Sequence, residues 1–106
     1  MGQDKVLNML GLSSKGGNIQ SGEFMTESSV KAGRSSLVII ASDASDNTKK
    51  MFKDMCSYYN TEFRIYSDKV SLGRAIGKEF RASISVTDKG LADKIIGLID
   101  NNNDRR

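Results

Sequence analysis

Apolar side chains recur every three or four residues along five stretches of the chain, which is the spacing that lets a helix bury one face. In the central stretch the expected inner stripe is Phe52, Met55, Cys56 and Tyr59, at positions i, i+3, i+4 and i+7. Serine or aspartate stands at the expected start of the last three helices, and glycine follows the first two. The predicted helices cover about residues 4–14, 21–33, 46–59, 68–77 and 88–99.

Two segments have clear patterns of β-strands. Residues 36–41 are apolar on both faces, which is typical of a central strand that is covered from both sides. Residues 62–66 alternate instead, so we expect a half-buried strand with Phe63 and Ile65 facing inward.

A third strand is predicted over residues 82–87, where apolar residues alternate with Ser83 and Ser85 on the outer face. Residues 19–21 form a short extended link between the first two helices. Because helices and strands alternate along the chain, the sequence predicts an α/β protein, a three-layer α/β/α sandwich with a mixed central sheet.

Length and composition are those of one small globular domain. The chain has 106 residues, of which 38% are hydrophobic and 27% charged. We expect residues 1–100 to form the domain and the polar residues 101–106 to be disordered. No apolar run approaches the length of a membrane span, and the N-terminal residues do not resemble a secretory signal, so we expect a cytoplasmic location.

The residue inventory argues against an enzyme. The chain has no histidine and a single cysteine, Cys56, which falls on the inner stripe of its helix and is expected to be buried and inert. Residues 73–78 suggest a phosphate-binding loop, but only three residues separate the glycines and Glu79 stands where the magnesium-binding hydroxyl belongs. We therefore expect no catalytic site, metal, other cofactor or small-molecule substrate, and a monomer that folds without them.

The second predicted helix places a phenylalanine where water is expected. Met25, Ser29 and Val30 fall on the inner side of this helix, whereas Phe24 lies among polar residues on the outer side. Gly22 precedes Phe24 and opens the helix, whose free N–H groups suit an anion such as phosphate. We expect Phe24 to be exposed beside an anion-binding helix end.

A second unpatterned aromatic residue, Phe80, stands in the loop between the fourth helix and the last strand. Lys78 and Arg81 flank it, and the net charge of the chain is +3. Exposed rings between basic residues are typical of surfaces that stack on bases and bind phosphates in RNA. The sequence equally allows Phe24 and Phe80 to pack on each other or to cover a loop.

Several motifs resemble those of a known family, and they occur in its order and spacing over Leu10 to Ile99. That family is the ribosomal L-seven-Ae family of kink-turn RNA-binding proteins, and the chain looks most similar to its bacterial YlxQ-like branch. The similar segments are SGE at residues 21–23, LVIIASDAS at 37–45, NTKK at 47–50, LGRAIGKE at 72–79 and VTD at 86–88.

The resemblance implies the α/β/α fold and a role in binding structured RNA. Family members grip a kink-turn with the start of the second helix and the loop before the last strand. At the positions of Phe24, Met25 and Ser28 the best-known members have Asn, Glu and Lys, which reach the edges of tandem G·A pairs. All three residues differ here. The set that we expect to bind RNA is Gly22, Glu23, Phe24, Met25, Ser28, Lys31, Lys49, Lys69, Lys78, Glu79, Phe80 and Arg81.

The main alternative is a protein-interaction module that uses Phe24, Met25 and Phe80 as an apolar patch. A continuous positive band across the surface would favour RNA, whereas an apolar island ringed by acidic residues would favour a protein partner. A more remote alternative is the detached substrate-binding domain of an enzyme.

Overall fold

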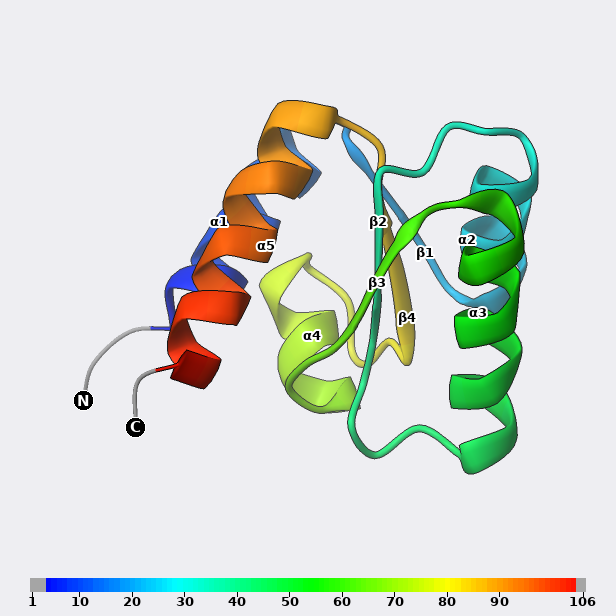
Figure 1. The fold of residues 1–106 in the computed structure, drawn as a ribbon. Helices are drawn as coiled ribbons and strands as arrows, with labels where there is room; N and C mark the ends of the chain where they lie inside the picture. Colours follow the sequence, from blue (N-terminus) through cyan, green and yellow to red (C-terminus); the bar gives the residue numbers. More distant parts are fainter. Residues whose placement is uncertain (1–3, 105–106) are drawn as a thin grey trace.

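The computed structural model describes residues 4–104, which form five helices and four strands (Figure 1). In chain order they are α1 (Lys5–Lys15), β1 (Ile19–Ser21), α2 (Glu23–Lys31), β2 (Leu37–Ile40), α3 (Asp46–Tyr59), β3 (Glu62–Ile65), α4 (Lys69–Ala75), β4 (Ser83–Val86) and α5 (Lys89–Asp104).

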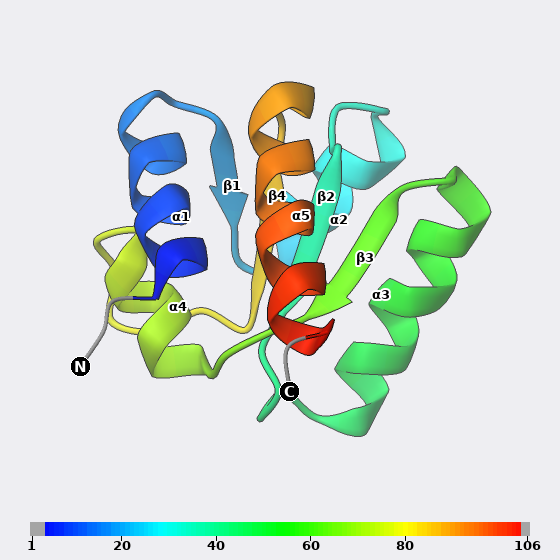
Figure 2. The same cartoon turned by 60° about the vertical axis from the view of Figure 1, so that its left-hand side comes forward.

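The four strands form one mixed sheet in the order β1-β4-β2-β3. The central strand β4 is antiparallel to both β1 and β2, and β3 pairs with β2 in parallel. Helices α1, α4 and α5 cover one face of the sheet, and α2 and α3 cover the other (Figures 1 and 2). The predicted three-layer α/β/α sandwich is therefore confirmed, and the expected link at residues 19–21 is the edge strand β1.

Local capping explains where the helices begin. The side chain of Ser45 accepts a hydrogen bond from the Thr48 N–H at 3.1 Å, and α3 has the bounds that the sequence predicted. Asp68 accepts in the same way from the Ser71 N–H at 2.8 Å, and this bond lowers the pKa of Asp68. These caps use contacts three residues apart, so the sequence alone locates them.

Strand β4 differs from the alternation that we expected. Ser83 and Ser85 are as buried as their apolar neighbours, because β4 is a central strand with helices over both faces. The Oγ atoms of Ser85 and Ser29 lie 2.9 Å apart, and Ser85 also donates to Ser35 Oγ at 2.8 Å. Hydrogen bonding between hydroxyl groups makes the burial of Ser85 and Ser29 tolerable.

The apolar residues of β3 and the end of α3 are more exposed than the pattern indicated. Ile65, expected to face inward, and Tyr59, expected on the inner stripe, are both exposed, whereas Phe52 and Cys56 are buried as predicted. The reason is position, since β3 is an edge strand and Tyr59 lies in the last turn of its helix. Burial raises the pKa of the Cys56 thiol to about 11.

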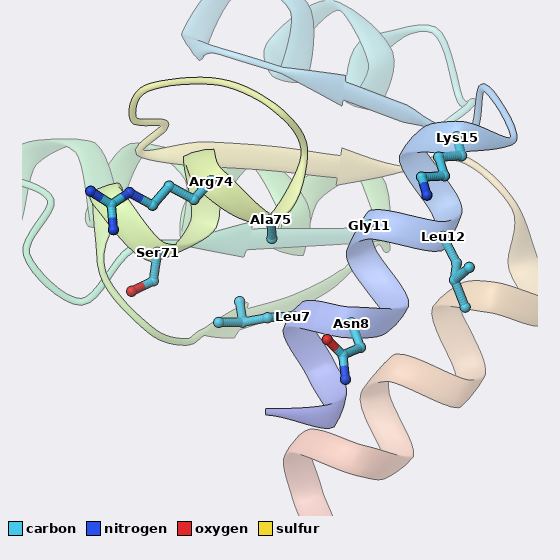
Figure 3. A pocket seen from close by; sticks show the side chains of 8 residues that line it. All are labelled: Leu7, Asn8, Gly11, Leu12, Lys15, Ser71, Arg74 and Ala75. Atoms are coloured by element: carbon cyan, nitrogen blue, oxygen red, sulfur yellow. The ribbon is translucent and has the colours of Figure 1, made fainter. Parts of the chain in front are cut away.

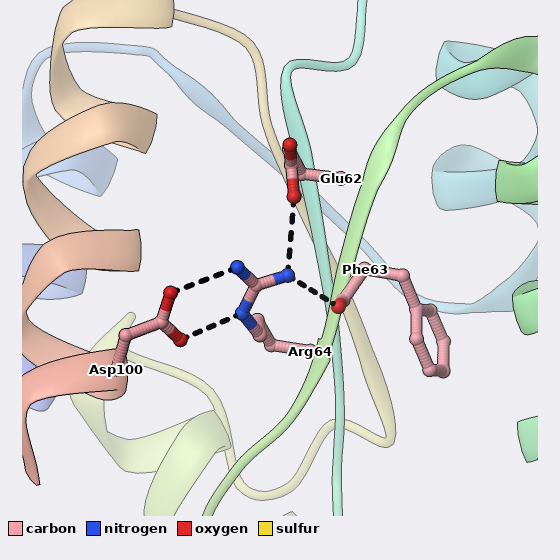
Figure 4. A network of polar contacts seen from close by, with 4 residues as sticks. All are labelled: Glu62, Phe63, Arg64 and Asp100. Atoms are coloured by element: carbon pink, nitrogen blue, oxygen red, sulfur yellow. Dashed lines mark hydrogen bonds and ion pairs between the residues drawn. The ribbon is translucent and has the colours of Figure 1, made fainter. Parts of the chain in front are cut away.

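An ion-pair network protects the open edge of β3 (Figure 4). The Arg64 guanidinium makes two hydrogen bonds to the Asp100 carboxylate, at 2.9 and 3.0 Å, and a third to Glu62 at 3.1 Å. It also donates to the Phe63 carbonyl at 2.9 Å, which occupies a backbone acceptor of the edge strand. The bond from Arg64 lowers the pKa of Asp100.

Helix α5 extends further than expected. It runs to Asp104, which places residues 101–104 in a helix although we expected the chain to be disordered from residue 101. Each added helical residue gains a backbone hydrogen bond without requiring burial, and no proline or glycine stops the helix there. Residues 105 and 106, the rest of the expected tail, lie outside the described part.

No helix within residues 4–104 is long and apolar enough to cross a membrane.

Candidate RNA-binding surface

Four loops meet at one edge of the sheet. Because β1, β2 and β3 run in the same direction and β4 opposes them, the carboxyl ends of three strands and the amino end of β4 lie together (Figure 1). Helices α2, α3 and α4 therefore begin at this edge, which we call the loop edge. Side chains already cap α3 and α4, so the start of α2 is the helix end at this edge whose N–H groups suit an anion.

Gly22 shapes the start of α2. Its φ of 91° lies in the region that favours glycine, and its N–H donates to the Ser83 carbonyl at 3.0 Å. No side chain caps this helix, so its first N–H groups remain available to an anion. Beyond the α-carbon of Gly22 there is open space, which would allow a ligand to approach the backbone closely.

The buried face of α2 differs from the one that the spacing predicted at one position. Thr26, Ser29 and Val30 face the protein interior, whereas Met25, which the spacing placed on the same side as Ser29 and Val30, is exposed as a surface residue. Phe24 is exposed as predicted, with 75% of its surface accessible.

The loop from α4 to β4 carries the second aromatic residue and is held closely against α4. Gly73 makes this approach possible, because a β-carbon at that position would lie 2.4 Å from the α-carbon of Phe80. The Lys78 N–H donates to the Gly73 carbonyl at 2.8 Å, and Phe80 is 57% exposed.

Arg81 ties this loop to the start of α2. Its Nε donates to Ser21 Oγ at 2.9 Å, and its backbone N–H donates to the Lys69 carbonyl at 2.9 Å. The two segments that the sequence singled out, 60 residues apart, thus lie on one surface. In the described part of the chain, Tyr58 and Tyr59 form the one pair of rings in contact, so Phe24 and Phe80 do not pack on each other.

The sequence missed three residues that position this surface, namely Ser21, Asp43 and Gly73. The residues around Asp43 are typical of a turn. In the structure its carboxylate accepts a hydrogen bond from the Lys69 N–H at 2.9 Å and so caps α4 from a neighbouring loop. Gly73 lies in the segment LGRAIGKE, and the resemblance of that segment to the family was the signal that could have pointed to it. For Ser21, nothing in the sequence pointed to Arg81.

The predicted residues do not all gather at the loop edge. Lys49 lies in the first turn of α3, which begins at the loop edge, and it lines a groove toward β3. Lys31 is at the far end of α2, about 12 Å along the axis from Glu23 at 1.5 Å per residue. It pairs with Glu27 at 2.9 Å, a bond that raises the pKa of Lys31. The remaining predicted residues belong to the start of α2, the start of α4 and the loop after α4.

The acidic residues near the loop edge are partly committed to other contacts. Asp43 and Asp68 accept hydrogen bonds from backbone N–H groups of α4, and Glu27 is paired with Lys31. Glu23 and Glu79 are the exposed acids next to the aromatic residues. Of the three acids around the aromatic residues, Glu27 is thus paired with a cation, while Glu23 and Glu79 form no ion pair within the described residues.

Residues 4–96 match the ribosomal protein L7Ae/L30e/S12e/Gadd45 family. The RNA-binding protein YlxQ of Bacillus subtilis (strain 168) is 39% identical over 92 residues, which cover 87% of this chain and 92% of that protein. The protein of the same name from Enterococcus faecium is 34% identical over 99 residues, 92% of this chain and 94% of that protein. A solved structure of a protein with unknown function from Bacillus halodurans has a TM-score of 0.90 and 38% identity, covering 92% and 99% of the two chains. The resemblance found in the sequence is confirmed.

Proposed function

The chain belongs to the ribosomal protein L7Ae/L30e/S12e/Gadd45 family, and from this premise we propose that it is a non-catalytic RNA-binding protein that recognises a kink-turn or internal loop in structured RNA. The names of its two YlxQ relatives support RNA as the partner. We further propose that it acts as a cytoplasmic monomer, with ribosomal or other translation-related RNA as its target.

The exposed Phe24 carries this proposal. A large ring in the first turn of an uncapped helix has no structural partner in the described part of the chain, yet it stands where an unpaired base can stack. Base stacking on an aromatic side chain is worth about 1–3 kcal/mol. Phe80 would offer a second ring, and Lys69 at the start of α4 and Lys78 in the loop after it would contact phosphates.

Shape and phosphate contacts dominate the proposed recognition. Phe24, Met25 and Ser28 cannot make the polar base-edge contacts of the best-known family members, because none of them carries the required amide or charge. A good bidentate base contact is worth roughly 1–3 kcal/mol on the DNA scale, so the selectivity for tandem G·A pairs is expected to be at least about tenfold weaker.

The test compares Phe24→Ala with Tyr58→Ala by titrating a labelled kink-turn RNA and a duplex of the same length. Tyr58 is a matched control, because it is also an exposed aromatic residue, 82% accessible, and lies about 18 Å along α3 from its start. Phe24→Ala should weaken kink-turn binding about tenfold, and Tyr58→Ala should not. Both variants should melt like the wild type because neither ring is buried.

A third variant restores the family residues with Phe24→Asn, Met25→Glu and Ser28→Lys together. It should bind tandem G·A pairs more tightly than the wild type does. Equal affinities for all four proteins would place RNA binding elsewhere on the molecule. If the wild type binds neither RNA, or binds without salt dependence, the protein-interaction alternative gains support.

A further inference from the structure

The face built around α1 has features that the proposed RNA surface does not use. One open groove of about 480 Å³ lies between α1 and α4 (Figure 3), and another of about 390 Å³ lies between α1 and α5. Leu12 lines both grooves and is 61% exposed, although it sits in the middle of a helical layer. We call these two grooves and the ridge between them the α1 face.

The floor of the α1 face is aliphatic beside α5 and mixed beside α4, where the polar residues Asn8 and Ser71 also line the groove. Leu7 and Ala75 line the groove beside α4, and Met9 and Leu98 line the groove beside α5. These four side chains are half-buried against the core, so each keeps some surface open to the groove. No aromatic ring lines either groove, which gives a nucleic acid nothing to stack on and favours an aliphatic partner.

The rim of the α1 face is basic. Lys5 and Lys94 line one groove, and Lys15 and Arg74 line the other. Within residues 4–104 none of these four cations forms an ion pair, although the charge of Arg74 contributes weakly to lowering the pKa of Asp68.

The neighbouring acidic residues are engaged with other groups. Asp4 accepts hydrogen bonds from the Leu7 N–H and the Tyr66 hydroxyl. Asp93 pairs with Lys89, and Asp100 pairs with Arg64. Both donors to Asp4 are neutral and leave its negative charge beside Lys5, so the α1 face presents an excess of positive over negative charge around an apolar ridge.

We propose that the α1 face binds an acidic amphipathic helix of a partner protein. Leucine-type side chains of the partner would enter the grooves on either side of Leu12, and its carboxylates would meet the basic rim. Lys5 and Lys15 are ten residues apart on α1, about 15 Å, so a partner segment of about three helical turns spans the face. This site is separate from the loop edge and does not depend on RNA binding.

The experiment uses three synthetic 14-residue peptides and the full chain labelled with ¹⁵N. The first peptide has glutamate on one helical face and leucine on the other, the second has lysine in place of glutamate, and the third is a scrambled version of the first. The acidic amphipathic peptide should shift the amide signals of α1 and of residues 91–98. The other two should shift them much less, and added salt should weaken the binding.

Two variants localise the binding. Leu12→Ser removes the ridge, and Lys15→Glu with Lys94→Glu reverses the charge of both rims. Each should weaken binding about tenfold. Lys15→Arg should bind like the wild type, and melting midpoints should show that every variant is folded. Leu12 lies away from the loop edge and its replacement by serine keeps the net charge, so the affinity of the Leu12→Ser variant for RNA should stay unchanged.

Four results would overturn the proposal. They are equal binding of the lysine or scrambled peptide, amide shifts confined to the loop edge, no binding at all, or self-association of the wild type that Leu12→Ser abolishes. The last would assign the α1 face to a second copy of this chain. A fifth result, from a separate vesicle-binding measurement, would also overturn it: preferential binding of anionic vesicles over the acidic peptide would assign the α1 face to a membrane surface.

Discussion

Replacing Gly73 with alanine should disturb the loop that carries Phe80. A β-carbon at this position would lie 2.4, 2.6 and 2.8 Å from the α-carbon, nitrogen and carbonyl carbon of Phe80. Carbon atoms pack best at about 3.5–4.0 Å, so either α4 or the loop must move by about 1 Å. These contacts are with backbone atoms, which no change of rotamer can relieve.

The expected loss of folding stability can be estimated from the hydrogen bonds and the packing of this loop. If the loop moves, the bonds from Lys78 N–H to Gly73 and from Arg81 N–H to Lys69 are broken, at about 1 kcal/mol each. If it stays, an overpacked contact costs about 1–3 kcal/mol. Alanine has the better helix propensity, which offsets about 1 kcal/mol. The net loss should be about 1–2 kcal/mol, or roughly 5–15 °C in melting midpoint.

Gly97→Ala is the matched control, because Gly97 also lies within a helix but has open space where the β-carbon would be. This change should raise stability by about 0.5–1 kcal/mol. Thermal melting and urea titration measure both variants, and the kink-turn RNA titration shows whether Phe80 has been displaced. A Gly73→Ala protein that melts and binds RNA like the wild type would refute the claim that the close approach at Gly73 positions the loop.

Two other predictions concern titratable groups. The pKa values of Asp68 and Asp100 are lowered by hydrogen bonds from the Ser71 N–H and from Arg64, so their contribution to stability is present above the unfolded-state pKa of about 4. Stability should fall as the pH drops below about 4, and less so in a variant with Asp68→Asn and Asp100→Asn, as measured by melting at successive pH values. Because burial raises the pKa of Cys56 to about 11, iodoacetamide at about pH 8 should label its thiol only as fast as the protein unfolds. Labelling of the native protein at the rate of an exposed thiol would show that Cys56 is accessible.

Part of the candidate site could be predicted from the chain alone. Phe24 stands on the polar side of a short helix, and Phe80 has no periodic partner, so both were expected at the surface and both are exposed. The spacing placed Met25 on the inner side of α2, but Thr26 takes that place, because α2 packs against β1 and β4 and local spacing does not encode those neighbours.

The sequence by itself determined the helices and strands and the alternation that makes the fold an α/β sandwich. Those features depend on side-chain spacing and on caps such as Ser45 and Asp68, which act within one helical turn. The tertiary structure decided the strand order, and with it the burial of Ser85 and the exposure of Ile65. It also decided that Arg81 meets Ser21, because strand pairing joins segments far apart in the chain and local periodicity carries no information about which strands will be neighbours.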